Sequence, residues 1–118
     1  MKYGVERARD TDRDLASIFD FLIESYQAFG EDTDGAIERA ASRVRDIETA
    51  MLSLGDAPHQ GTLRPEILPG LRSVTKQRAI FYFDVDEGRR MVRVLAVFFG
   101  GQDHQRRMLR RLLGDKDS

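Results

Sequence analysis

The stretch RAIFYFDVDEGRRMVRVLAVFF, from Arg78 to Phe99, decides the fold because it contains two apolar strands in succession. Every second residue from Ala79 to Val85 is apolar, which is the period of a β-strand. Met91–Phe99 is almost continuously apolar, which is typical of a strand inside a sheet. The polar segment Asp86–Arg89 predicts a tight turn between them. The centre of the protein is therefore predicted to be a β-hairpin.

Two further strands are predicted outside this hairpin. Lys2–Ala8 alternates apolar and polar residues, and so does Leu71–Lys76, which places Arg72 and Lys76 on one face. The segment between Gly55 and Gly70 contains all three prolines of the chain and is predicted to be a loop with turns.

Two helices are predicted to precede the loop, because apolar residues recur at helical spacing in Leu15–Phe29 and again in Ile37–Leu54. Thr11 begins the sequence TDRD, which resembles a capping box at the start of the first helix. Gly30–Gly35 interrupts the pattern and supplies Asp and Thr as a new cap. The two helices are expected to form an antiparallel hairpin.

Two residues depart from the helical patterns. Phe21 lies outside the apolar arc of the first helix, so it either packs sideways on a neighbour or serves as an exposed anchor for a partner. Glu48 lies within the apolar arc of the second helix. It is expected either at the edge of that arc with an Arg partner or, alternatively, in a catalytic role.

A short amphipathic helix is predicted from His104 to Leu113. Its arginines, Arg106, Arg107, Arg110 and Arg111, fill one arc, and its apolar residues fill the opposite one. The order of elements is then βααβββα. We therefore expect an α+β fold, in which residues 1–118 form a single domain with a helical hairpin packed on a small, mostly antiparallel sheet.

Composition limits the classes of function. The chain has 118 residues, a net charge of −1 and no cysteine, so disulfide frameworks and thiol nucleophiles are excluded. It has no apolar run long enough for a membrane span and no secretory signal, so a cytoplasmic location without a membrane partner is expected. Met1–Gly55 carries a charge of −5 and Asp56–Ser118 carries +4. These halves either attract each other or present different faces to partners.

The sequence offers little for catalysis. His59 and His104 are the only histidines and lie far apart in the sequence, so neither a metal site nor a cofactor is predicted. His104 is a candidate general base, although a locally hydrogen-bonded helix-start residue is the favoured explanation. The Gly100-Gly101 turn resembles a phosphate-binding loop, but Asp103 would occupy the same amides as a helix cap.

Four basic residues form a more coherent candidate site. Arg72, Lys76, Arg78 and Arg93 all fall on the predicted strands and are predicted to bind a target. An arginine inside a central strand, such as Arg93, requires a carboxylate or an external anion. Alternatively, the same cations neutralise Glu48 and the acidic helical hairpin.

Two stretches of the chain resemble a known family. HQGTLRPEILPGLRSVTKQRAIFYFDVD, residues 59–86, and VRVLAVFFGGQDHQRRML, residues 92–109, are similar to the ParE branch of the RelE/ParE toxin superfamily. The resemblance implies a toxin of a type II toxin–antitoxin system. Its partner would be a small cognate antitoxin, expected to be a ribbon-helix-helix protein with a disordered tail that folds on binding. ParE-like members poison DNA gyrase, whereas RelE-like members cut messenger RNA on the ribosome.

The chain departs from the nuclease pattern of this superfamily. Arg72 and Arg78 match arginine positions of RelE-like nucleases, but Phe98–Gly101 replaces a late arginine and no tyrosine follows Tyr82. The first hypothesis is therefore a non-enzymatic ParE-like toxin that binds gyrase, with no sequence-specific DNA binding of its own. The alternatives are a RelE-like endoribonuclease using Arg72, Arg78 and His104, and a non-toxic relative that only binds its partner. The antitoxin is expected to contact Phe21, Arg106, Arg107 and Arg110.

Overall fold

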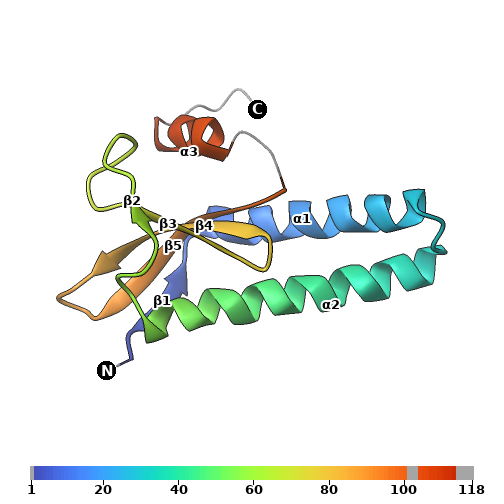
Figure 1. Ribbon diagram of the computed structural model, residues 1–118, viewed down its shortest axis with the longest axis horizontal. Coiled ribbons are helices and arrows are strands. Elements are labelled where there is room, and N and C mark those ends of the chain that lie inside the picture. The colour runs from blue at the N-terminus through green and yellow to red at the C-terminus, as the bar shows by residue number, and fades with distance from the viewer. Residues whose placement is uncertain (1, 101–103, 114–118) are drawn as a thin grey trace.

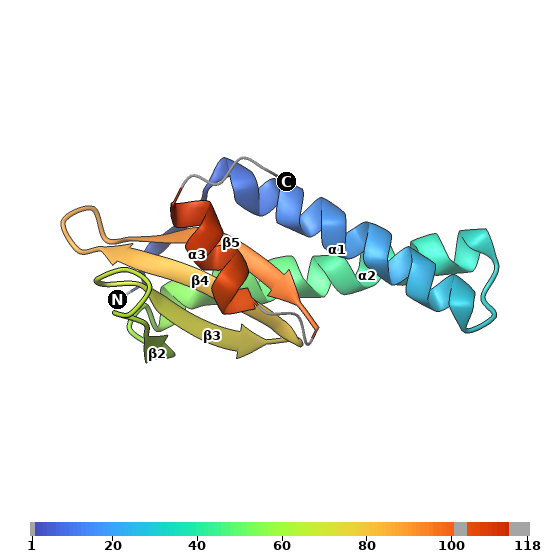
Figure 2. The same cartoon turned by 90° about the horizontal axis from the view of Figure 1, so that it is seen from above.

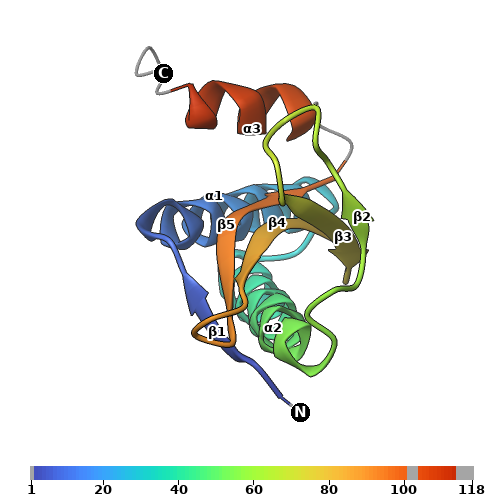
Figure 3. The same cartoon turned by 90° about the vertical axis from the view of Figure 1, so that its left-hand side faces the viewer.

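The computed structural model describes residues 2–100 and 104–113, and in the second segment the side chains from 107 onward. The predicted α+β order is confirmed, and a helical pair covers one face of the sheet while a short helix crosses the other (Figures 1 and 3). The elements are β1 Gly4–Arg7, α1 Arg9–Ala28, α2 Thr33–Leu52, the 3₁₀ turn η1 Ser53–Asp56, β2 Thr62–Leu63, β3 Arg72–Lys76, β4 Ala79–Asp86, β5 Met91–Phe99 and α3 His104–Leu112.

The predicted hairpin lies at the centre of the sheet. The strand order in the described residues is β1-β5-β4-β3-β2, in which β1 runs parallel to β5 and the other neighbours are antiparallel. Strands β3 and β4 are joined by Gln77 and Arg78, which both have positive φ, as a type I′ turn requires. The prediction that Arg78 begins a strand is therefore wrong, because Arg78 belongs to the turn.

Helix α1 starts earlier than the capping box suggested. Its first residue is Arg9, and Thr11 is fully buried, with its hydroxyl donating to the Val94 carbonyl at 3.1 Å. Strand β1 ends where Arg7 pairs with Val94, so the edge of β5 beyond that point has no partner strand. Side chains of α1 satisfy this edge in place of a strand, which is why Thr11 is not a cap.

The core has two parts, one on each face of the sheet. On the face towards α1 and α2, the buried residues are Leu15, Ile18, Leu22, Ala40, Ile47, Met51, Leu54, Ala79, Phe81, Phe83, Val92, Val94 and Val97. On the face towards α3 they are Leu71, Tyr82, Ala96, Phe98 and Met108. The two faces keep their apolar character because a register shift opposite Tyr82 and Phe83 leaves Leu95 as an extra residue in β5.

The predicted loop between Gly55 and Gly70 contains more structure than expected. It begins within η1 and includes β2, a two-residue strand that pairs with β3. Gly61 has φ +82°, and a Cβ built there would lie 2.4 Å from the Ser73 carbonyl oxygen. Only glycine fits where the loop crosses β3 this closely. No helix of the described segments is long and apolar enough to span a membrane.

Candidate functional site

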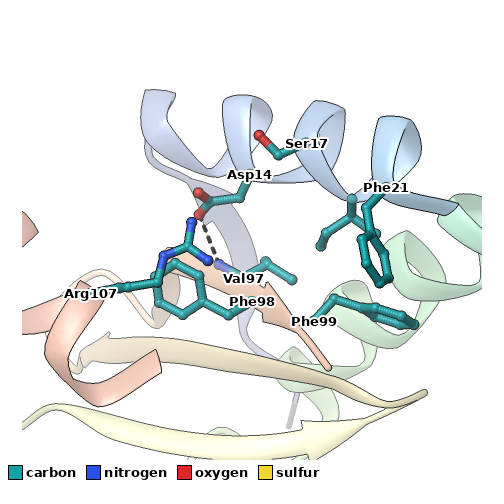
Figure 4. Close-up of a pocket in the computed structure, with 8 residues that line it drawn as sticks. Asp14, Ser17, Phe21, Val97, Phe98, Phe99 and Arg107 are labelled. Carbon is teal, nitrogen blue, oxygen red and sulfur yellow. Dashed lines mark hydrogen bonds between the residues drawn. The ribbon is translucent and has the colours of Figure 1, made fainter. Parts of the chain in front are cut away.

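A small pocket lies where α1, the end of β5 and α3 meet (Figure 4). Its volume is about 80 Å³. Its lining mixes apolar with polar and charged side chains: Asp14, Ser17, Ile18, Phe21, Val97, Phe98, Phe99 and Arg107. Segments far apart in the sequence build this pocket, since α3 lies over β4 and β5 beside the start of α1 (Figure 2).

The pocket depends on a tether between α1 and α3. The Asp14 carboxylate is buried and accepts hydrogen bonds from the Val97 amide at 2.9 Å and from both terminal nitrogens of Arg111, at 2.7 and 2.9 Å. Arg111 also donates to the carbonyl of Leu95, the extra residue of the bulge, at 3.1 Å. The hydrogen bond to Asp14 is the main cause that raises the pKa of Arg111. The tether fixes one end of α3 on the sheet.

The sequence did not predict this tether. Helical spacing grouped Arg111 with solvent-facing arginines, whereas the structure turns its guanidinium inward to Asp14. The helix is held by that ion pair and by Met108, which is fully buried against the second core cluster. As a result, Leu109 and Leu113 on its predicted apolar arc stay exposed. No spacing rule connects residues 14 and 111, so pattern analysis had no signal for the pair.

Aromatic rings form one wall of the pocket. Phe21 is 48% exposed, and its ring lies 6.1 Å from that of Phe99 at an interplanar angle of 59°. The interpretation that Phe21 packs sideways on a neighbour is therefore confirmed, and its role as an anchor for a partner stays a prediction. Arg107 lies over the Phe98 ring at 4.9 Å, a distance at which cation–π attraction contributes.

The structure brings together two residues of the predicted antitoxin-binding set. Phe21 and Arg107 line the same pocket although they lie on different helices. Arg110 is exposed on α3. Asp103 and the side chains of His104 and Arg106 lie outside the described residues, so the cap, the candidate base and one predicted contact stay predictions.

The predicted target-binding set is not one patch. Arg72 and Lys76 alternate with the buried Ser73 and so share the sheet face on which the helical hairpin packs. Arg93 lies on the opposite face, where it pairs with Asp84 at 3.2 Å, so of its two predicted partners, a carboxylate or an external anion, the structure shows the carboxylate.

Arg72 and Arg78 of the predicted target-binding set lie at opposite ends of β3, and Glu48 pairs with a different arginine. Arg72 donates to the His59 carbonyl at 2.7 Å, which ties β3 to the loop that follows η1. Arg78 stands in the turn at the other end of β3. Glu48 lies at the edge of the apolar arc and accepts from Arg7 at 3.1 Å, as its structural interpretation predicted.

A second cluster joins three distant segments through one carboxylate. Glu87 accepts from the Tyr3 hydroxyl at 2.8 Å and lies 2.5 Å from His59 Nε2. The His59 hydrogen bond, then that of Tyr3, lowers the pKa of Glu87, and the Glu87 contact raises the pKa of Tyr3. All three side chains border solvent, and Glu87 also lines a surface pocket with Asp84, Arg89 and Arg93, among other residues. The cluster links β1, the loop and the β4–β5 turn. No group of three His, Asp or Glu side chains in the described residues could hold a metal ion.

Comparison with solved structures finds the same fold in toxin–antitoxin proteins. A chain of the chromosomal ParDE toxin–antitoxin system from P. aeruginosa superimposes with a TM-score of 0.65 at 22% identity, covering 85% of this chain and 98% of that one. A chain of the RelBE2 toxin–antitoxin complex from Mycobacterium tuberculosis gives 0.54 at 20% identity, covering 86% and 95%. No protein-family model and no curated protein matches the sequence. This chain therefore has the fold of the RelE/ParE toxins, as the sequence resemblance predicts.

Proposed function

We propose that this protein is the toxin of a type II toxin–antitoxin pair and that it acts as ParE-like toxins do, by binding DNA gyrase. A cognate antitoxin, small and partly disordered before binding, neutralises it. The fold shared with the ParDE chain supports the toxin assignment.

We prefer a binding toxin to a nuclease because the candidate nuclease residues do not lie together. Cleavage of RNA needs an acid, a base and cations around one phosphate. Arg72 holds a backbone carbonyl at one end of β3, and Arg78 occupies the turn at its other end. Phe98, near the position where nuclease relatives keep an arginine, is buried beneath α3. This arrangement favours recognition of a protein surface.

An assay of two purified systems tests the proposal. Titrated into DNA gyrase and relaxed plasmid, the chain should inhibit supercoiling, while a reconstituted translation reaction should continue. Lys76→Glu should weaken inhibition by about tenfold, since reversing a charge at an interface affects encounter and affinity. Arg13→Glu, an exposed change on the outer surface of α1, is the matched control. Arrest of translation with normal supercoiling would favour the RelE-like endoribonuclease, and no effect on either would favour a non-toxic partner-binding relative.

A further inference from the structure

The pocket continues into a basic surface at the same end of the sheet. We define the turn-end surface as the exposed parts of Phe21, Arg43, Gln77, Arg78 and Phe99. These residues are neighbours because Ala79, which follows the turn, pairs with Phe99.

Arg43 is held in a fixed position on this surface. Its guanidinium donates to the side-chain oxygen of Gln77 at 2.9 Å and to the Gln77 carbonyl at 2.7 Å, and it lies 5.7 Å from the centre of the Phe99 ring. These contacts are all with neutral groups, so within the described chain no carboxylate balances the charge of Arg43. The neighbouring Arg78 has no ion pair or hydrogen bond in the described segments and is exposed. Arg43 is therefore a preorganised cation, and Arg78 adds a second exposed cation on the adjoining turn, beside the pocket.

The pocket and the cations define the chemistry of the occupant. A cavity of 150 Å³ admits benzene, so one of about 80 Å³ suits a branched aliphatic side chain. The Asp14 carboxylate in the pocket is paired with Arg111, so it does not repel an incoming negative charge. The complement is a peptide in which a Leu, Ile or Val lies next to Asp or Glu residues.

Nucleic acid fits this surface less well. Single strands bind on open aromatic faces where successive bases can stack. Here one face of the Phe99 ring lies under Arg43, and the Phe21 ring is tilted by 59° to it, so the pair offers no continuous stacking platform. A side chain inserted from a peptide needs no such platform.

We infer that the turn-end surface and the adjoining pocket bind an acidic, aliphatic segment of the antitoxin, with an aliphatic side chain against Phe21 and carboxylates on Arg43 and Arg78. This inference rests on the proposed function, because it requires that a cognate antitoxin exists. It adds which residues receive the antitoxin and what sequence chemistry that segment must have.

The test measures binding of the intact chain to the purified product of the neighbouring reading frame, and to short overlapping fluorescent peptides that cover it. The peptide that binds should carry an aliphatic residue among acidic ones. Phe21→Ala and Arg43→Glu should each weaken binding by about tenfold or more, as expected for anchor and charge contacts. Arg45→Glu, an exposed change two residues along the same helix, should leave affinity within about twofold.

A variant that fills the pocket distinguishes loss of peptide binding from loss of folding. Ser17 is exposed at the pocket margin, so Ser17→Trp fills the entrance without removing core contacts and should also abolish peptide binding. Equal binding of the neighbouring protein to wild type, Arg43→Glu and Ser17→Trp would overturn the inference and leave the proposed antitoxin standing. No binding even to wild type would overturn both. Loss of single-stranded RNA binding in Arg43→Glu, with antitoxin binding intact, would reassign the surface to nucleic acid.

Discussion

Replacement of Asp14 by Ala should detach α3 from the body of the protein. The substitution removes an acceptor of three hydrogen bonds and leaves the Arg111 guanidinium and the Val97 amide without it. Breaking a buried ion pair by removing one partner costs about 3–5 kcal/mol. The Arg111 side chain is 25% exposed and retains the Leu95 carbonyl, which places the loss at the lower end, about 3 kcal/mol. For a chain of this size the melting temperature should fall by roughly 10 °C.

Urea unfolding followed by circular dichroism measures this effect. Asp10→Ala is the matched control, because Asp10 lies 3.8 Å from Arg111 with a side chain 48% exposed and should contribute less than about 1 kcal/mol. Adding Arg111→Met to Asp14→Ala should recover part of the loss, since the double variant leaves no buried charge unpaired and only the half-exposed Asp10 loses a partner. Stability of Asp14→Ala within about 0.5 kcal/mol of wild type would refute the tether.

Three further substitutions test other parts of the fold. Thr11→Val should lower the free energy of unfolding by about 0.5–1.5 kcal/mol because it removes one of two hydrogen bonds to the Val94 carbonyl, which still accepts from the Ala8 amide, whereas Thr11→Ser should retain most of the stability in the same urea assay. Gly61→Ala should destabilise more than Gly70→Ala, for which a left-handed residue costs about 1–2 kcal/mol, because only Gly61 would also clash with a carbonyl; equal melting temperatures would argue against that close crossing. Glu87→Gln should remove a pH dependence: the folded-state pKa of Glu87 is lowered, so its stabilisation is present above the usual Glu value near 4.3 and is lost as the pH falls through the folded pKa. Urea midpoints that change in parallel for both proteins below pH 5 would contradict this role.

The central elements could be predicted because their residues follow simple periods. The apolar runs of β4 and β5 correspond to the middle strand of the sheet and its neighbour, and both strands bury side chains on both faces. The β-bulge at Leu95 could not be predicted, because a run of apolar residues keeps its character whichever face each residue takes. Strand β2 was missed for a related reason, since two residues show no period.

Predictions from local sequence patterns were wrong where a side chain bonds to a group that is distant in the sequence. Thr11 and Asp14 have the spacing of a helix cap, yet both are committed to the open edge of β5, which only the folded sheet creates. Gln77 and Arg78 form a type I′ turn without the Asn or Gly that usually signals one.

The candidate site was predicted residue by residue but not as an arrangement. Helical periodicity singled out Phe21 and Arg107, and the predicted strands singled out Arg78, but only the fold decides which of them are neighbours. Arg43 was missed because it looks like one more charged residue on a helix surface. Its contacts with Gln77 and Phe99 exist only after the helical hairpin packs on the sheet.

One measurement tests the proposed function most directly: incorporation of labelled thymidine and of labelled amino acids, followed together after the protein is induced in growing bacteria without its neighbouring gene. A ParE-like toxin that binds gyrase should stop DNA synthesis first, induce the DNA-damage response and leave protein synthesis running, and co-expression of the neighbouring gene should reverse all of this. Prompt loss of amino-acid incorporation while DNA synthesis continues and the chromosome stays intact would contradict the proposal.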